Sequence, residues 1–340
     1  MKIYFAGVPG GGAKEEKKLI YSTVLLSYFY QSKEIETMNE SENIKGKIDL
    51  FLDSGAFSAK TQGAKIDIYE YINFIKKNKK IINVYANLDV IGDPEKTAIN
   101  QRIMEKEGLK PLPVFHFGED EEKYLKPMIK KYDYIALGGL VKAGNLTAYL
   151  DRLHNNYICD DKGMPKVKVH GFGLTSTQHI VRYPWYSVDS TSWGFISRYG
   201  GIYMPKYKNG KWLYNENAIT LSVSSKCNDK KFAGRHFLTL TPKSQEVVLK
   251  YLALKGYEMG RSSFKEVPCN YELKENEKFD GKKSKEKNQN RMVEVIEEIG
   301  IATHYQLRDE INIQYFLDLG QSVPKWPWAF SKKSITGFGL

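Results

Sequence analysis

The chain has little cysteine and no long apolar run. Its 340 residues include only Cys159, Cys227 and Cys269, which lie far apart without a C-x-x-C pair. This spacing excludes a disulfide-rich scaffold and a zinc ribbon, and it favours a reducing compartment. No run of about 18 apolar residues occurs, and the apolar stretch at the start is shorter than a signal sequence requires. We therefore expect a cytoplasmic protein with no membrane partner.

Acidic residues are fewer than basic ones. Lys and Arg total 51 against 40 Asp and Glu, a formal net charge of +11. This balance indicates attraction to a polyanion, although a lysine-rich proteome explains it equally well. Hydrophobic residues make up 41% and aromatic residues 13% of the chain, which is enough apolar material for a core. Disordered, collagen-like and coiled-coil classes are thereby excluded.

Short β-rich runs alternate with amphipathic stretches as far as about residue 193. Candidate strands are 2–8, 48–53, 82–88, 112–117, 134–137, 167–171 and 186–188, and candidate helices are 68–80, 95–108, 121–132 and 146–157. This alternation predicts βα units with a parallel sheet. Seven units in one series favour an α/β fold of the (β/α)8 TIM-like barrel type over a doubly wound sheet. Either 218–223 or 237–241 would supply the eighth strand.

The composition changes after residue 194. Residues 194–214 are rich in Tyr, Trp, Gly and Lys, which indicates an aromatic and basic insertion after strand 7. Residues 272–291 are charged and poor in apolar side chains, as solvated loops and linkers are. A short helix is expected at about 292–299. We predict a catalytic barrel over 1–260, including an insertion at 194–235, and a lysine-rich linker with a C-terminal extension over 261–340 that packs on the barrel.

Polar or glycine-rich clusters follow six of the candidate strands. Three of these clusters contain an aspartate, namely Asp53, Asp89 and Asp189, and the others are 116–119, 138–140 and 170–173. The carboxyl ends of the strands in a parallel barrel converge on one mouth, so we expect these residues to face a common pocket. Turn and cap chemistry also uses Asp, Ser and Gly, but this explanation fits one loop better than six.

Strand-end carboxylates without a metal-ligand cluster suit chemistry at a glycosidic carbon. One carboxylate attacks or stabilises an oxocarbenium-like centre while another moves protons, a logic that ordinary glycosidases share. His116 and His170 lack an H-x-H partner. We interpret them as strand-end histidines with satisfied hydrogen bonds rather than as metal ligands.

Five short segments, in the same order along the chain, resemble motifs of the tRNA-guanine transglycosylase family. The sequence DSGAF at 53–57 resembles D-S-G-G-F-Q, and Asp89 falls where the family has A-F-D. LGGLV at 137–141 is similar to G-G-L-A-V, HGFG at 170–173 to L-M-G-V-G, and SVDS at 187–190 to G-V-D-x-F-D. The resemblance covers roughly residues 48–193 and implies a base-exchanging pentosyltransferase.

The resemblance also implies roles for individual residues. Asp189 would be the nucleophile at the anomeric carbon C1′, and Asp53 the general acid/base for the departing and incoming bases. Asp89 would accept hydrogen bonds from the base, and the backbone of Gly138 and Gly139 would approach its edge closely because neither has a Cβ. The further base-binding candidates are Ser54, His116 and Phe57, the last as a stacking surface or equally as a core aromatic.

Two family features are missing. The family has a C-x-C-x-x-C…H zinc site after the nucleophile, and Cys227, His236, Cys269 and His304 do not rebuild that spacing. We therefore predict no zinc cofactor there, or at best an unconventional site. The family's P-T-R segment is replaced by TSWGF at 191–195. Because both regions place tRNA in the family, the resemblance favours the phage and bacterial relatives that exchange guanine in DNA for a 7-deazaguanine such as preQ0.

A DNA substrate requires base flipping and basic contacts to the backbone. The candidate segments are 199–214 and 283–291, the second of which suits a solvated loop equally well. Trp326 and Trp328 are candidates for base stacking, although anchoring of the chain end is the commoner use of Trp. A tRNA enzyme without zinc and an inactive nucleic-acid-binding barrel remain as alternatives, and retention of Asp53 and Asp189 argues against the second. The individual nucleic-acid contacts proposed are Arg198, Lys206, Lys208 and Lys211.

Overall fold

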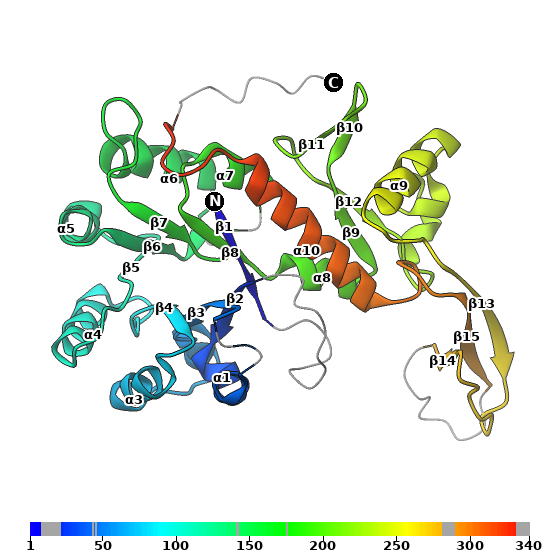
Figure 1. The fold of residues 1–340 in the computed structure, drawn as a ribbon, viewed down its shortest axis with the longest axis horizontal. Coiled ribbons are helices and arrows are strands. Elements are labelled where there is room, and N and C mark those ends of the chain that lie inside the picture. The colour runs from blue at the N-terminus through cyan, green and yellow to red at the C-terminus, as the bar shows by residue number, and fades with distance from the viewer. Residues whose placement is uncertain are drawn as a thin grey trace. The chain divides into compact units, whose positions relative to one another are not determined.

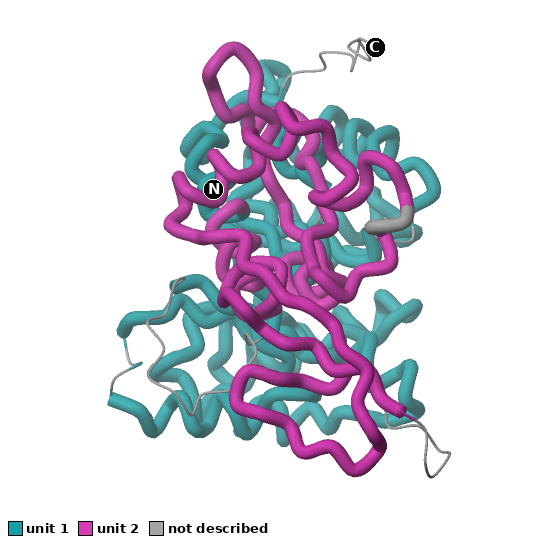
Figure 2. The backbone as a smooth tube through the Cα atoms, turned by 90° about the vertical axis from the view of Figure 1, so that its right-hand side faces the viewer, with its two compact units in different colours: residues 1–191, 316–340 teal, residues 192–315 magenta. Residues whose placement is uncertain are grey.

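The computed structural model describes residues 1–7, 22–42, 44, 46–140, 143–174, 176–280 and 290–330. The chain divides into two compact units (Figure 2), one of Met1–Thr191 with Phe316–Leu340 and the other of Ser192–Tyr315. The predicted boundary at 260/261 falls inside the second unit. Position 141 of the glycine-rich motif and most of the tract at 283–291 lie outside the described residues.

An eight-stranded parallel sheet forms the centre of the first unit. Its strands run in the order β4-β3-β2-β1-β8-β7-β6-β5. Their bounds are β1 (Lys2–Ala6), β2 (Thr23–Ser27), β3 (Asp49–Asp53), β4 (Ile82–Tyr85), β5 (Val114–His116), β6 (Tyr134–Gly138), β7 (Lys168–Gly171) and β8 (Ser187–Ser190).

Helices follow most of these strands and lie around the outside of the sheet (Figure 1). The α-helices are α1 (Tyr28–Glu40), α2 (Ala56–Thr61), α3 (Ile68–Asn78), α4 (Pro94–Lys106), α5 (Lys126–Lys131), α6 (Leu146–Leu153) and α7 (Thr177–Arg182). Two π-helical turns, Glu121–Leu125 and His154–Ile158, extend α5 and α6. Helix α3 shows why they form, because the Asp67 side chain accepts from two first-turn N–H groups while Ile72 and Ile75 are buried.

The interior of the sheet is filled by side chains from nearly all parts of it. One buried cluster joins Tyr4, Leu25 and Phe51 from one half of the strand order to Val114 and Ala136 from the other half. A single parallel bridge, between Ala86 after β4 and Leu112 before β5, also links the two edge strands. Side chains of distant strands meet in this way only when the sheet curls.

The seven strands predicted before residue 193 are confirmed, but the eighth was wrong. The eighth strand is β2, whereas residues 219–222 pair with another strand of the second unit and residues 237–239 form a 3-10 turn. Helix α1 begins at the residue directly after β2. Without a turn residue between them, strand and helix merge into one apolar run whose periodicity is ambiguous. The second unit therefore follows strand eight of the sheet, not strand seven.

The second unit has its own apolar core. Residues from β9 (Gly201–Met204), β12 (Ile219–Ser222), α9 (Pro242–Leu254) and α10 (Tyr305–Ser322) build it, including Ile202, Leu221, Tyr251 and Ile311. The remaining elements are α8 (Ser192–Arg198), β10 (Lys206–Lys208), β11 (Lys211–Leu213), 3-10 turns at Asn228–Lys231 and Phe237–Thr239, β13 (Arg261–Val267), β14 (Glu277–Phe279) and β15 (Arg291–Glu298).

Two predictions in this unit need correction. The helix expected at 292–299 is strand β15, which pairs antiparallel with β13 and β14, and part of the expected loop at 272–291 is β14. The run Val293–Val295–Ile296 is β-branched and finds partners on both sides, so tertiary pairing outweighs the helical spacing. In the part of the chain that the structure describes, no helix is long and apolar enough to cross a membrane.

Candidate functional site

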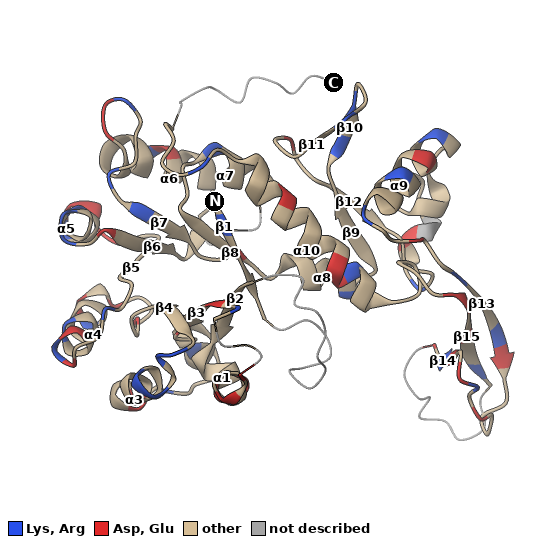
Figure 3. Ribbon diagram, in the orientation of Figure 1, with Lys and Arg blue, Asp and Glu red and all other residues tan. Residues whose placement is uncertain are grey.

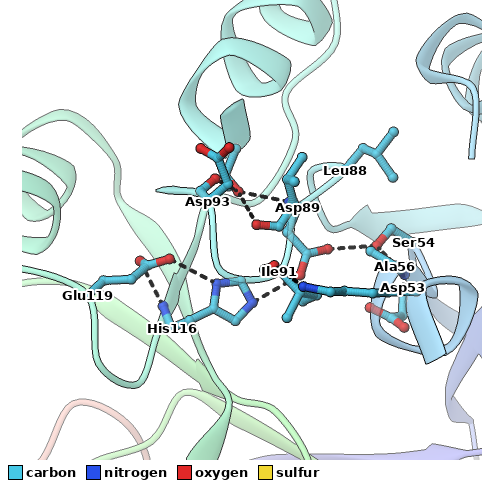
Figure 4. Close-up of polar contacts among 12 residues, drawn as sticks. Asp53, Ser54, Ala56, Leu88, Asp89, Ile91, Asp93, His116 and Glu119 are labelled. Atoms are coloured by element: carbon cyan, nitrogen blue, oxygen red, sulfur yellow. Dashed lines mark hydrogen bonds and ion pairs between the residues drawn. The ribbon is translucent and has the colours of Figure 1, made fainter. Parts of the chain in front are cut away.

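Asp53 and Asp89 are joined through a buried serine at the carboxyl ends of neighbouring strands. Asp53 is the last residue of β3, and its Oδ2 accepts from the backbone N–H of Gly55 at 3.1 Å. Ser54 is fully buried and its Oγ donates to Asp89 Oδ1 at 2.9 Å (Figure 4). Gly55 has a φ of +76°, and a Cβ there would lie 2.5 Å from atoms of Ser27 and Phe29. Only glycine allows this tight turn.

His116 lies between two carboxylates at the end of β5. Its Nε2 is 2.9 Å from Asp89 Oδ2, and its Nδ1 is 3.4 Å from Glu119 Oε1 (Figure 4). The backbone N–H of His116 also donates to Glu119 Oε2 at 3.0 Å. Burial lowers the pKa of His116, but the hydrogen bonds to Asp89 and Glu119 outweigh it and raise the pKa to about 9. The ring is therefore an imidazolium at neutral pH.

Glycine makes room for this imidazolium. A Cβ on Gly138, the last residue of β6, would lie 2.8 Å from His116 Cδ2 and 3.0 Å from Nε2. Gly139 has a φ of +69° and its missing Cβ would face the backbone N of Phe117 at 3.4 Å. Both glycines of the predicted base-binding segment thus adjoin the His116–Phe117 strand end. Within the protein, Gly138 permits the close approach of the His116 ring, and Gly139 permits that of the Phe117 backbone.

The acidity of the Asp53 carboxyl group is strongly altered. Burial, followed by the negative charges of Asp89 and Asp189, raises its pKa to about 7, although two backbone N–H groups oppose the rise. A carboxyl group of this kind is half protonated near neutral pH, so it can both donate and accept a proton. The same electrostatic coupling ties the three predicted carboxylates to one site.

Asp189 is held by a second histidine. It lies on β8, is 6% exposed, and its Oδ1 accepts from the backbone N–H of Gly173 at 2.8 Å. His170 Nε2 is 3.3 Å from the same oxygen, and His170 Nδ1 is 2.7 Å from Ser187 Oγ. Burial lowers the pKa of His170 and outweighs the opposing effect of Asp189. His170 is therefore a neutral imidazole at neutral pH.

The other predicted residues are distributed over both units. Phe57, on α2, is 53% exposed. The basic residues belong to Ser192–Tyr315, where Arg198 and Lys211 are exposed and Lys206 and Lys208 lie on β10, which is blue in Figure 3. Glu216 pairs with Lys206 at 3.1 Å and with Lys208 at 2.9 Å, so these two charges are partly neutralised within the protein. Trp326 packs edge-on against Tyr186 of the first unit.

Within the described residues, no group of three or more His, Cys, Asp or Glu side chains is placed to hold a metal ion. The three cysteines are free, with Cys159 buried and Cys269 exposed. A hollow of about 240 Å³ between α4 and the helix at 121–131 borders the site only through Glu119 and Asn87.

Reasoning from sequence missed three functional candidates that the structure adds to the site. Glu119 enters the sequence analysis only as a member of the 116–119 cluster, Ser187 only as part of a strand and of the SVDS segment, and Tyr134 only as a strand residue. The place of Ser187 in the site can be inferred from the sequence. It stands two positions before Asp189 on one strand, so both side chains point to the same face of the sheet. The pairing of Glu119 with His116 cannot be inferred in this way, because it depends on the conformation of the turn after β5.

The fold and the site define an α/β protein with an eight-stranded parallel sheet and a group of coupled carboxylates at its strand ends. Comparisons of the chain with protein-family models, with curated proteins and with solved structures return no match.

Proposed function

We propose that the protein is a transglycosylase that exchanges guanine in DNA for a 7-deazaguanine base such as preQ0. The observation that carries the proposal is the set of three aspartates at the strand ends, in which Ser54 joins Asp53 to Asp89, the Gly173 N–H holds Asp189 Oδ1, and burial with the charges of Asp89 and Asp189 raises the pKa of Asp53 to about 7. Displacement at a glycosidic carbon requires one carboxyl group that can give a proton and another that acts as a nucleophile. The motif resemblance supplies the substrate class.

The reaction proceeds in two displacements. Asp189 forms a bond to C1′ as the bond from C1′ to the glycosidic nitrogen of guanine breaks, and the electron pair of that bond leaves with guanine. The departing nitrogen takes its proton from Asp53. Asp53 then removes a proton from the incoming base, whose nitrogen displaces Asp189 and restores the carboxylate. No net oxidation or reduction occurs.

Base recognition falls to the group around Asp89. Its two oxygens are engaged by Ser54 and His116, which orients the carboxylate, and it keeps lone pairs for N–H groups of a base. We assign Ser54, His116 and the Gly138–Gly139 segment to this base-binding side, with Phe57 as a stacking surface. Arg198 and Lys211, with Lys206 and Lys208, would contact the nucleic-acid backbone.

We further infer that the sheet closes as a (β/α)8-type barrel. The hydrogen bond between Asp89 and His116 supports closure, because it connects the ends of β4 and β5, the two edge strands of the order. The Ala86–Leu112 bridge supports it as well. A closed barrel gathers strand-end loops at one mouth, where enzymes of this fold have their active sites.

The test is to incubate the protein with guanine-containing duplex DNA or tRNA and radiolabelled preQ0 or guanine, then to count label in the polymer. Label in DNA is expected. Label in tRNA alone would establish the tRNA alternative, and label in neither, with nucleic-acid binding retained, would establish the inactive alternative.

The Asp189→Asn variant should form no covalent adduct with the nucleic acid, and its exchange rate should fall on the order of 10³-fold or more, as losses of a catalytic nucleophile do. Asp49→Asn is the matched control, because Asp49 stands at the opposite end of β3 and pairs with Lys2 at 2.6 Å. An adduct trapped with Asp189→Asn would contradict the nucleophile assignment.

A further inference from the structure

A continuous chain of hydrogen bonds runs behind the Asp189 carboxylate. Tyr134 Oη lies 2.6 Å from Ser187 Oγ, Ser187 Oγ lies 2.7 Å from His170 Nδ1, and His170 Nε2 lies 3.3 Å from Asp189 Oδ1. Tyr134 and Ser187 are the first residues of β6 and β8, while Asp189 stands near the end of β8. The chain thus connects the amino-terminal side of the strands with the site at their carboxyl ends.

Hydrogen-bond chemistry determines the direction of this chain. A carboxylate oxygen only accepts, so in the contact with Asp189 Oδ1 the Nε2 of a neutral His170 carries the proton and donates it. Nδ1 is then an acceptor, and Ser187 must donate its hydroxyl proton to it. The remaining contact requires Tyr134 to donate to Ser187 Oγ, and burial raises the pKa of Tyr134, which keeps that proton in place. Every donor in the chain points toward Asp189.

The surroundings hold the central ring in place. His170 is fully buried, and its ring centroid lies 4.6 Å from that of Phe51 and 4.5 Å from that of Phe172. The ring of Tyr4 packs edge-on, with its centroid 6.1 Å from that of His170. Ser187 is fully buried as well. Full burial among three aromatic rings restricts rotation of the imidazole, so the packing supports the hydrogen-bond chain.

The chain also distinguishes the two oxygens of Asp189. The hydrogen bonds that Asp189 accepts from described residues, from His170 and from the Gly173 N–H, both end on Oδ1. A nucleophilic carboxylate needs one oxygen for the new bond and benefits when the other is held. A donor at Oδ1 also stabilises the carboxylate when it departs in the second displacement.

We propose that Tyr134, Ser187 and His170 are positioning residues that hold Asp189 Oδ1 through a one-directional hydrogen-bond chain and leave Oδ2 as the oxygen that attacks C1′. The attack rests on the proposed function, whereas the direction of the chain does not. In the reacting complex, the Oδ2–C1′ bond forms while the C1′–N bond breaks, and no proton moves along the chain.

The first experiment reads the tautomer of His170 in the protein alone. Long-range ¹H–¹⁵N spectra at neutral pH should show a neutral imidazole with its proton on Nε2, assigned by the signal lost in His170→Gln. The protein contains six histidines, so the signals of His170 can be assigned. A proton on Nδ1, or an imidazolium, would overturn the proposal. In Ser187→Ala the Nε2–H form should lose population because Nδ1 has lost its donor.

The second experiment measures base exchange. Ser187→Ala should lower kcat roughly tenfold, as the loss of one buried hydrogen bond does, while KM for the incoming base stays unchanged. Tyr134→Phe should give a smaller decrease of the same kind. Ser197→Ala is the control for the first, because Ser197 is buried and donates to the carbonyl of Tyr305, and Tyr132→Phe is the control for the second.

The outcomes separate the two proposals. An unchanged kcat in Ser187→Ala, with exchange active in the wild type, would overturn the positioning role while leaving the proposed function intact. No exchange by the wild type, together with the Nε2–H tautomer, would remove the proposed function and the assignment of Oδ2, and the chain would stand as a structural element. A fall in stability without a change in tautomer or kcat would reduce Ser187 to a packing role.

Discussion

Two aspartate–histidine pairs stand at the strand ends, Asp89 with His116 and Asp189 with His170, and their histidines carry different charges. His116 is flanked by two carboxylates, and the pKa of its ring is raised to about 9. His170 faces one carboxylate at the longer distance of 3.3 Å, lies among aromatic rings, and burial lowers its pKa. The same two residue types thus form an ion pair in one place and a neutral donor in the other.

This difference shows that the number of partners and the degree of burial decide protonation. A second carboxylate offsets the loss of hydration for His116, whereas a single one does not do so for His170. The two histidines therefore act differently on their aspartates. The His116 imidazolium forms an ion pair with Asp89, and the neutral His170 imidazole forms a hydrogen bond with Asp189.

The largest expected effect comes from Asp53, whose pKa is raised by the carboxylates of both pairs. Asp53→Asn should lower exchange on the order of 10²–10⁴-fold, because it removes the proton that the departing base needs. In the wild type, release of guanine should fall as pH rises through about 7, where Asp53 loses its proton. Rapid-quench measurement of released guanine between pH 5.5 and 9 checks this.

Asp89→Asn should lower the pKa of Asp53 more than Asp189→Asn does, because Asp89 raises it more. ¹³C titration of the Asp53 carboxyl group measures both variants, and equal shifts would contradict the ranking of the two charges.

The next effect concerns stability, on the order of 3 kcal/mol for His116. The pKa of His116 is raised above 6.5, so its stabilisation is complete below pH 6.5 and is lost as pH rises through about 9. The pKa of His170 is lowered, so its contribution is present above pH 6.5 and declines as pH falls below that value. Urea unfolding should show His116→Gln losing the decline on the basic side and His170→Gln losing the decline on the acidic side. If the free energy of unfolding depended on pH in the same way in both variants, the proposed difference between the two histidines would be contradicted.

The smallest effect tests the space around the imidazolium. Gly138→Ala places a Cβ 2.8 Å from the ring of His116 and should cost about 1–3 kcal/mol in the free energy of unfolding, with a fall in the pKa of His116. Gly144→Ala is the control, because nothing lies within 4 Å of a Cβ there. Thermal unfolding and a histidine titration measure both. A Gly138→Ala protein as stable as the control would show that the ring can shift at no cost.

Much of the first unit is predictable because its signals are local. Strand β3 has three consecutive buried apolar residues, at 50–52, and ends in Asp53, while α3 has a cap and an apolar stripe, so periodicity and capping identify both. Strand β2 was not predicted because no turn separates it from α1. Strand β15 was mistaken for a helix because pairing with β13 and β14, which no local pattern reveals, decides its conformation.

The site divides in the same way. The alternation of apolar strands and polar ends was sufficient to select Asp53, Asp89 and Asp189, since parallel strands bring their carboxyl ends to one edge. It did not select Glu119 as a partner of His116, Ser187 as a partner of His170, or Tyr134 as a partner of Ser187. The first contact depends on the conformation of the turn after β5. The other two depend on the register between strands, and a shift of one residue would turn each side chain to the other face.

The sequence by itself determined the strand-end carboxylates and the parallel α/β sheet, because apolar periodicity and residue type are properties of short segments. Only the tertiary structure decided the charge on each histidine and the near-neutral pKa of Asp53. Protonation depends on burial and on charges contributed by other strands, and these exist only after the chain has folded.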